Sequence, residues 1–260
     1  MNTSNNTILI TGGASGIGLE LTKQLSLLSN TIIITGRNQA KLDDVKKQIP
    51  KVHTIQSDVT DTQSIEALFN IISKDFPDLN VLINNAGIMR TINLHETTDS
   101  LTDITQEIDT NLNGPIRMVK QFLPHLKTRK NAAIMNVTSG LAFVPLPTAP
   151  VYSATKAGLH FFTLSLRVQL SKTNIKVFEL APPATQTHLL NQFDKEDMKE
   201  VKIMKVQAMV SAAIKGMKND QYEIRPGQSN QLKIMSRLAP GFTLGQLSKP
   251  VERMLCNLKH

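Results

Sequence analysis

The sequence predicts an α/β protein with a doubly wound parallel sheet, folded as a single domain over residues 1–260. Apolar runs of strand length alternate along the chain with stretches of helical periodicity, which is the order of a βαβ fold. The runs are β-branched and continuously apolar, as suits strands buried on both faces of a parallel sheet. No linker, repeat or low-complexity tract divides the 260 residues, and 40% apolar residues suffice for one sizeable core.

Six strands are predicted, each from a short run that is followed by a small or polar residue. The first run, "TILIT", leads into glycines, and the second, "TIIIT", leads into Gly36. In doubly wound sheets, ligands bind beyond the carboxyl ends of the strands, so the residues after each run are the informative ones. The predicted strands are Thr7–Thr11, Thr31–Thr35, Val52–Gln56, Val81–Ile83, Ala133–Val137 and Lys176–Leu180.

Helices are predicted between these strands. Parallel neighbours need long crossover connections, and the intervening segments have both the length and the helical spacing of apolar residues. Each helix would return the chain to the start of the next strand. The predicted helices are Ile17–Leu28, Ala40–Ile49, Ser64–Phe76, Leu101–Leu126 and Ser153–Ser171.

The composition excludes several function classes. Cys256 is the single cysteine, so an intrachain disulfide is impossible, and the six histidines lack the spacing of metal ligands. We therefore expect no metal site. The apolar runs are far below the roughly 18 residues of a membrane span, and Met1–Thr7 is too short and polar for a signal peptide. We expect a cytoplasmic protein without stable membrane insertion.

The formal charge of +8 is concentrated near the C-terminus. Residues 199–260 carry 11 Lys or Arg against 4 Asp or Glu, whereas the rest of the chain is nearly neutral. Such a surplus could attract an acidic substrate, an acyl carrier, an anionic membrane or nucleic acid. We interpret it as a solvated positive face and expect no nucleic-acid partner.

The glycine-rich segment "TGGASGIG", residues 11–18, joins the first strand to the first helix. Gly12, Gly16 and Gly18 lack a Cβ, so the backbone N–H groups of a helix N-terminus can approach a pyrophosphate, which the helix dipole attracts. The spacing differs from the standard GxGxxG dinucleotide fingerprint, and a tight structural turn is the alternative. Its place between a strand and a helix favours a dinucleotide site.

The second strand ends in "TGR", where dinucleotide folds contact the adenine ribose. An acidic residue there would bind the ribose 2′-hydroxyl, and none is present. Gly36 leaves room, and Arg37 supplies a planar, permanently charged fork that suits a 2′-phosphate. The sequence therefore predicts NADP(H), with NAD(H) as the second choice; a solvent-exposed arginine without a ligand is the alternative.

Three motifs in this order, "TGGASGIG" at 11–18, "NNAG" at 84–87 and "YSATK" at 152–156, resemble the short-chain dehydrogenase/reductase family in its short, single-domain form. The resemblance covers roughly residues 7–187. It implies a Rossmann-like fold that moves a hydride between a nicotinamide cofactor and a carbonyl or alcohol. The residues expected at the cofactor are Gly12, Ser15, Gly16, Ile17, Gly18, Arg37, Asp58, Val59, Asn85, Ala86, Gly87, Tyr152, Lys156, Pro182 and Thr187.

Asn111, Ser139, Tyr152 and Lys156 match the catalytic positions of that family. Carbonyl reduction needs a hydride from the cofactor and a proton from the protein. Tyr152 and Lys156 are four residues apart on one helical face, so the lysine can stabilise the tyrosinate; lowering the phenol pKa by two to three units requires roughly 3–4 kcal/mol. The resemblance implies that Ser139 holds the substrate oxygen, Asn111 fixes a relay water and Lys156 also binds the nicotinamide ribose.

The sequence departs from the family pattern after the sixth strand. "PPAT" at 182–185 stands where the family has Pro-Gly, although Thr187 is retained, and "YEIRPGQSNQ" at 222–231 replaces the glycine-rich last strand of many tetrameric members. We expect a homodimer through the helices Ser153–Leu170 and Leu101–Leu126, as is usual in the family, because the former is apolar on more than one face.

Residues 188–260 are expected to cover the substrate and form a C-terminal tail, which resembles that of a bacterial branch associated with lipoteichoic-acid D-alanylation clusters. Within the tail, apolar residues recur at helical spacing beside Lys249, which would suit an anionic membrane surface. Pro250 interrupts this stripe and favours packing or a substrate lid. The apolar residues of the stripe are Leu244, Leu247, Val251 and Leu255.

Apolar residues near the predicted site, Met89 and Leu141 among them, favour a fairly apolar carbonyl or alcohol as the small-molecule substrate. Arg90 and Arg225 are candidates to reach an acidic group on it, and a role in surface solubility is the favoured alternative for both. The alternative function is a catalytically silent NADPH-binding sensor or scaffold. The intact catalytic positions argue against that alternative, while Pro183 and the basic tail leave it open.

Overall fold

The computed structural model describes residues 1–95, 100–193, 196, 198–199 and 201–256. Within these residues, seven parallel strands form one sheet in the order β3-β2-β1-β4-β5-β6-β7, so the direction of winding reverses between β1 and β4. This is the predicted doubly wound sheet. The strands are β1 Thr7–Thr11, β2 Thr31–Gly36, β3 His53–Gln56, β4 Leu79–Asn84, β5 Ala132–Val137, β6 Ile175–Leu180 and β7 Glu223–Ile224.

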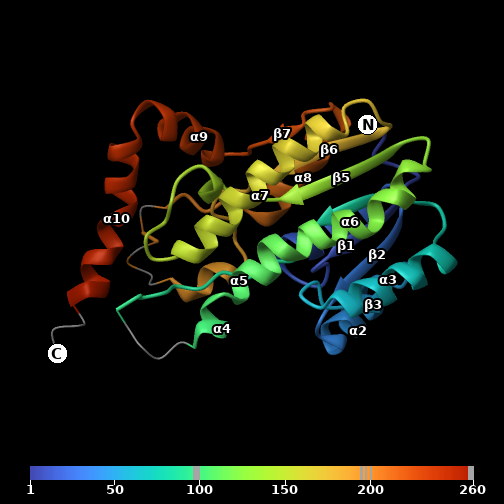
Figure 1. The fold of residues 1–260 in the computed structure, drawn as a ribbon, viewed down its shortest axis with the longest axis horizontal. Helices are drawn as coiled ribbons and strands as arrows, with labels where there is room; N and C mark the ends of the chain where they lie inside the picture. The colour runs from blue at the N-terminus through green and yellow to red at the C-terminus, as the bar shows by residue number, and fades with distance from the viewer. Residues whose placement is uncertain (96–99, 194–195, 197, 200, 257–260) are drawn as a thin grey trace.

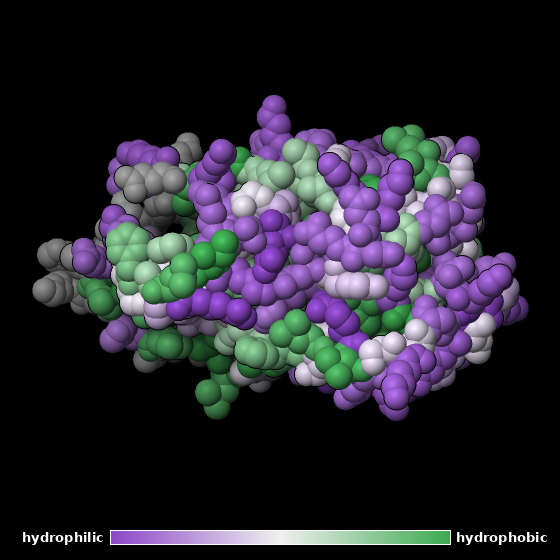
Figure 2. Space-filling view, turned by 90° about the horizontal axis from the view of Figure 1, so that it is seen from above, coloured by the Kyte–Doolittle hydropathy of each residue, from purple (hydrophilic) through white to green (hydrophobic). Residues whose placement is uncertain are grey.

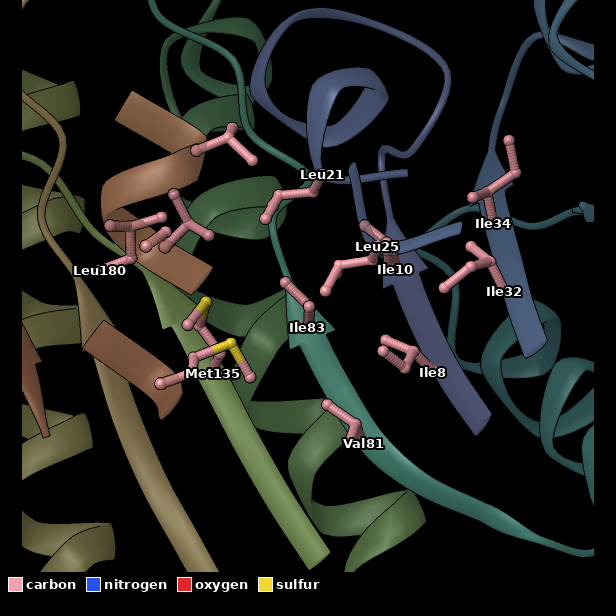
Figure 3. Close-up of a cluster of buried hydrophobic side chains, with 14 of the residues drawn as sticks. Ile8, Ile10, Leu21, Leu25, Ile32, Ile34, Val81, Ile83, Met135 and Leu180 are labelled. Carbon is pink, nitrogen blue, oxygen red and sulfur yellow. The ribbon is translucent and has the colours of Figure 1, made fainter. Parts of the chain in front are cut away.

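Helices cover both faces of the sheet (Figure 1). Side chains alternate along each strand, so Ile8 and Ile10 point to one face and Leu9 to the other. Figure 3 shows the first face, where side chains from five strands meet Leu21 and Leu25. The helices on that face are α1 Gly16–Ser26, α2 Gln39–Gln48 and α8 Val206–Lys218, and those on the other are α3 Thr62–Asp75, α6 Gly114–Lys127 and α7 Pro150–Gln169.

Local sequence explains where most of these helices begin. Asn38 caps α2 by accepting a hydrogen bond from the N–H of Lys41 at 3.0 Å, and Asp61 caps α3 by accepting one from Gln63 at 3.0 Å. Proline at the start of α7 has no N–H to leave unpaired. Ser15 precedes α1 without a side-chain cap, so the N-terminus of α1 keeps its free N–H groups.

The single helix predicted over Leu101–Leu126 is wrong. The structure has two short helices, α4 Leu101–Ile104 and α5 Gln106–Ile108, then a π-helical turn over Asp109–Asn113, and only then α6. The π turn places Asn111 where its side chain bonds across to the loop after β4. A tertiary bond of this kind leaves no mark on hydrophobic periodicity, and π turns are common at functional positions.

The sequence also missed β7. Its two residues carry none of the expected glycines, yet the N–H of Ala181 donates to the carbonyl of Ile224 at 2.9 Å and that of Glu179 to Tyr222 at 2.8 Å. A strand this short gives too small a period-2 pattern to be read from the sequence. The segment that replaces the glycine-rich strand of the family therefore still pairs with the sheet.

Two further helices, α9 Gln228–Leu238 and α10 Pro240–Cys256, follow β7 and extend beyond the carboxyl ends of the strands (Figure 1). The expected interruption at Pro250 is wrong, because α10 continues through it. Pro250 has no N–H to donate to the carbonyl of Gln246, four residues earlier in the helix. Because Gln246 is exposed, water can donate to that carbonyl instead. None of the helices among the described residues combines the length and hydropathy needed to cross a membrane.

Candidate active site

A cavity of about 880 Å³ opens at the carboxyl ends of the strands, where the winding of the sheet reverses. Its inner walls come from the turn between β1 and α1, the loops after β4, β5 and β6, and the start of α7. The structure brings most of the predicted site together there. The predicted residues that line the cavity are Gly12, Ser15, Gly16, Ile17, Asn85, Ala86, Gly87, Ser139, Tyr152, Lys156, Pro182 and Thr187.

The glycine turn is packed against the loop after β4. Gly12 has φ +65°, and a Cβ there would lie 2.9 Å from the Cα of Ala86. At Gly18, which does not line the cavity, a Cβ would lie 2.2 Å from the carbonyl oxygen of Gly12. Asn85 ties the two segments together, because its side-chain amide donates to the carbonyls of Thr11 at 3.0 Å and Gly12 at 3.2 Å.

The N-terminus of α1 fits the pyrophosphate of a dinucleotide. Ser15 makes no side-chain cap, and Ser15, Gly16 and Ile17 all line the cavity. The first N–H groups of a helix have no partner within it, and the helix dipole makes this end partly positive. Free N–H donors, the positive end of the helix dipole and a glycine-rich turn together allow an anion to bind at close range.

Arg37, Asp58 and Val59 stand apart from the cavity, at the carboxyl ends of the neighbouring strands β2 and β3. Arg37 is exposed, and no carboxylate of the described residues lies within ion-pair distance of its guanidinium. A Cβ at Gly36 would meet no atom nearer than 4.0 Å. The Asp58 carboxylate accepts hydrogen bonds from the N–H and hydroxyl of Thr60, both at 2.9 Å.

The end of β5 is held by successive turns of α7. The ammonium of Lys156 donates to the carbonyl of Val137 at 2.9 Å, and its Nζ lies 5.6 Å from the centroid of the Tyr152 ring. The hydroxyl of Ser139 is hydrogen-bonded to Tyr152 and accepts a bond from the N–H of Leu141 at 3.1 Å. The serine, tyrosine and lysine expected to act together therefore meet at one wall.

Burial moves the pKa values of this pair in opposite directions. It raises the pKa of Tyr152 to about 12, an effect that the Ser139 hydrogen bond reduces and the nearby Glu107 carboxylate increases. It lowers the pKa of Lys156 to about 8. We expected Lys156 to lower the pKa of Tyr152, but in the protein alone desolvation of the phenolate dominates. Tyr152 is thus a proton donor at neutral pH.

Asn111 is fully buried and does not line the cavity. Its side-chain oxygen accepts from the N–H of Ile88 at 2.9 Å, and its amide donates to the carbonyl of Ile88 at 2.8 Å and to Thr155 at 3.2 Å. The residue ties the loop after β4 to α7. Its role with a relay water stays a prediction.

Sequence reasoning missed a buried polar network directly behind Ser139. Glu179 of β6 is fully buried, accepts a hydrogen bond from the Thr138 hydroxyl at 2.7 Å and pairs with Nδ1 of His160 at 2.8 Å. His160 lies one helical turn beyond Lys156 on α7. The available signal was a glutamate inside the apolar run "KVFEL", because a charge in a buried strand requires a partner.

Arg90 and Arg225 do not reach the cavity, so the expectation that either binds an acidic substrate group is wrong. Arg90 pairs with the Asp103 carboxylate at 3.2 Å, and Arg225 with the Glu223 carboxylate at 3.4 Å. Both charges are neutralised within the protein. The sequence alone does not show which carboxylates the fold brings to them.

Comparison with known proteins places this site in a family. The profile of the short chain dehydrogenase family matches residues 6–198. The chain is a short-chain dehydrogenase. This dehydrogenase is 50% identical over 189 residues to the uncharacterized oxidoreductase DltE of Bacillus subtilis, an alignment that spans 73% of this chain and 75% of that protein. The family resemblance inferred from the three motifs is confirmed.

Solved structures extend the likeness beyond the matched residues. A short chain dehydrogenase from Burkholderia cenocepacia in complex with NADP has a TM-score of 0.82 and 23% identity, over 95% of this chain and 99% of that one. The 3-ketoacyl-(acyl-carrier-protein) reductase from Brucella melitensis, complexed with NADH, has a TM-score of 0.75 and 25% identity, over 82% and 90%. The short-chain dehydrogenase described here is therefore an oxidoreductase with a Rossmann-like, NAD(P)-binding fold.

Proposed function

We propose that this dehydrogenase transfers a hydride between NADP(H) and a carbonyl or alcohol substrate, with Tyr152 as the general acid and base. The observation that carries the proposal is that one cavity has Ser139, Tyr152 and Lys156 on one wall and the uncapped N-terminus of α1 on another. The nicotinamide, when bound, supplies or accepts the hydride. The proton must come from the chain itself.

Each catalytic side chain has a role that its contacts support. The Ser139 and Tyr152 hydroxyls are hydrogen-bonded to each other, so a substrate oxygen that replaces this bond can accept from both. In reduction, the Tyr152 proton passes to the substrate oxygen while the carbonyl carbon gains the hydride, which leaves an alcohol and a phenolate. The Lys156 ammonium, on the next turn of α7, stabilises that phenolate by its charge.

NADP(H) is favoured over NAD(H) by the end of β2. The guanidinium of Arg37 is exposed and free of carboxylates among the described residues, and Gly36 has open space beside it. A 2′-phosphate is a dianion that such a fork can bind through two parallel hydrogen bonds. NAD(H), whose ribose carries a hydroxyl at this position, gains nothing from Arg37.

We also propose that the chain forms a homodimer through α7. Phe161 and Val168 lie seven residues apart, hence on one helical face, and expose 67% and 74% of their surface. Ile108 of α5 is a third exposed apolar residue in the predicted interface. Apolar side chains exposed together on a helix are typical of a face that a partner covers.

Turnover tests the proposed function directly. Consumption of NADPH, and separately of NADH, is followed at about 340 nm against a panel of ketones, aldehydes and quinones, with Tyr152→Phe as the control. We expect turnover with NADPH that the variant loses. Tight NADPH binding without turnover of any compound would instead favour the sensor or scaffold.

A further inference from the structure

The cavity continues outward from the catalytic wall between two segments that carry none of the catalytic residues. On one side, Leu189 and Phe193 pack against the apolar cluster that contains Tyr152. On the other side, Leu232 of α9 lies against Gly140, the residue after Ser139. Each side of this outer part therefore has apolar side chains where it adjoins Ser139 and Tyr152.

Helix α10, which lies beyond the carboxyl ends of the strands, lines one side of this outer part (Figure 1). Phe242, Gln246 and Lys249 line the cavity at intervals of four and three residues, so they form one stripe along the helix. At 1.5 Å per residue this stripe spans roughly 10 Å. The outer part is thus a groove that has apolar side chains beside the catalytic wall and, on α10, a lysine seven residues along the helix from Phe242.

Among the described residues that line this outer groove, Lys199 has an ion-pair partner and Lys249 has none. Lys199 and Glu196, on the side opposite α10, pair with each other at 3.2 Å. Lys249 is exposed, and it makes no ion pair with any of the residues that the structure describes. A ligand with an anionic group beside Lys249 meets a positive charge that no carboxylate of the described residues neutralises.

The surface around the groove is also apolar. Figure 2 shows hydrophobic residues gathered at the end of the molecule where α9 and α10 lie. Leu238 exposes 78% of its surface there and Phe242, which also lines the groove, exposes 62%. An apolar compound can therefore contact the protein before its reactive group reaches Tyr152.

We propose that the substrate is an anionic amphiphile: a carbonyl or alcohol at Tyr152, an apolar chain along α9 and α10, and an acidic group at Lys249. The inference rests on the proposed function and adds the class of substrate. It replaces the expected contact with Arg90 or Arg225, since Lys249 lines the cavity and they do not.

Binding without turnover tests this proposal in the complete chain. Nile red, a neutral dye that fluoresces in apolar surroundings, is bound to the protein and then displaced with dodecanoate, dodecanol or butyrate. We expect dodecanoate to displace the dye at concentrations at least 100-fold below those of butyrate, because each buried methylene adds about two- to fourfold. Equal displacement by the two acids would overturn the proposal.

The anionic part is tested with Lys249→Gln, and Lys218→Gln serves as a matched control because Lys218 is exposed on α8 and does not line the cavity. We expect Lys249→Gln to weaken displacement by dodecanoate about fivefold, as for one exposed ion pair, and to leave dodecanol unchanged. The control should match the wild type for both compounds. No difference between the two variants would refute the contact with Lys249.

Cosedimentation with vesicles separates two sources of this chemistry, because Nile red itself partitions into any bilayer. Displacement of the dye by free dodecanoate, without cosedimentation of the protein with phosphatidylglycerol vesicles, supports a free acid as the substrate. Cosedimentation with phosphatidylglycerol vesicles but not with phosphatidylcholine vesicles supports a lipid.

A series of methyl ketones of increasing chain length distinguishes failure of this inference from failure of the proposed function. If dodecanoate binds selectively but no ketone consumes NADPH or NADH, the proposed function fails and the amphiphile site stands. If ketones of every length are reduced equally and dodecanoate does not displace the dye, the function stands and the inference fails. Thermal melting of each variant confirms that it is folded.

Discussion

Tyr152 and Lys156 lie on successive turns of α7 and are similarly buried, yet burial raises the pKa of one to about 12 and lowers that of the other to about 8. The reason is common to both: a desolvated site disfavours the charged form, which is the phenolate for tyrosine and the ammonium for lysine. The sequence places the two residues on one helical face. It does not show how deeply the fold buries that face, so the direction of the Tyr152 shift was not predictable.

The shift at Lys156 predicts how stability depends on pH. Its pKa falls from 10.5 to about 8 on folding, so between pH 8 and 10.5 the unfolded chain binds more protons than the folded one. Stability from this residue therefore rises over that window, by up to about 3 kcal/mol. We expect urea unfolding to show this rise in the wild type and not in Lys156→Met. Parallel pH profiles for the two proteins would contradict it.

Tyr152 acts in the opposite sense at higher pH. Its pKa rises from 10.0 to about 12 on folding, so the folded chain keeps a proton that the unfolded chain loses between those values. Stability should fall over this window in the wild type and less in Tyr152→Phe.

The activity of Tyr152 should also depend on pH. Alcohol oxidation needs the phenolate, so its rate should increase as the pH rises above neutrality, whereas the rate of carbonyl reduction should not. Initial rates in both directions from pH 6 to 10 check this.

Arg37 gives a prediction about the choice of cofactor. Arg37→Ala should raise the KM for NADPH at least about tenfold, as expected for the loss of charge-assisted hydrogen bonds, and leave the KM for NADH within twofold. Lys47→Ala is the matched control, since Lys47 is an exposed cation on the adjacent helix α2. A similar effect on both cofactors would show that Arg37 does not bind the 2′-phosphate.

Among the elements, the strands β1 to β6 and the helices α1, α2, α3 and α7 follow the predicted order with ends within a few residues. Most of the strands are apolar runs, and the helices carry apolar residues at helical spacing. The errors lie where tertiary contacts decide the backbone. Asn111 needs the loop after β4 for its π turn, and Glu223–Ile224 form a strand only because β6 presents a free edge. Hydrophobic periodicity carries neither kind of information.

Glu179 connects three of these elements, since it bonds to Thr138 after β5 and to His160 of α7 from its place in β6. Glu179→Ala should lower the free energy of unfolding by about 3–5 kcal/mol, because the buried His160 loses its carboxylate and Thr138 keeps only its bond to the carbonyl of Leu180. Glu179→Gln keeps hydrogen-bonding capacity and should lose about 1–2 kcal/mol. The exposed Glu66 of α3 provides the control variant Glu66→Gln. Urea unfolding that fails to separate the two Glu179 variants would rule out this account.

At the scale of the whole molecule, residues from Gly12 to Thr187 meet at one cavity because a parallel sheet brings the carboxyl ends of all its strands to one edge. This is why short motifs predicted the inner half of the candidate site. The outer half is built from α9, α10 and the described lining residues Leu189, Leu190, Phe193, Glu196, Met198, Lys199 and Val201, and it has no motif to predict it. The sequence therefore does not predict the shape of this outer half. The charges of Arg90 and Arg225 suggested a contact with an acidic substrate group, but both arginines pair with carboxylates of the protein itself.

The proposed homodimer through α7 is also a property of the whole molecule. A dimer through α7 should have a mass near twice the 28.7 kDa of the chain by light scattering at micromolar concentration. Phe161→Asp places a charge in that apolar interface and should weaken association by roughly 100-fold or more, because an unpaired charge would be buried there. Leu27→Asp is the control, since Leu27 is exposed at the end of α1, on the other face of the sheet. A monomeric wild type would rule out the dimer, and a dimer that survives in Phe161→Asp but dissociates in Leu27→Asp would move the interface to α1.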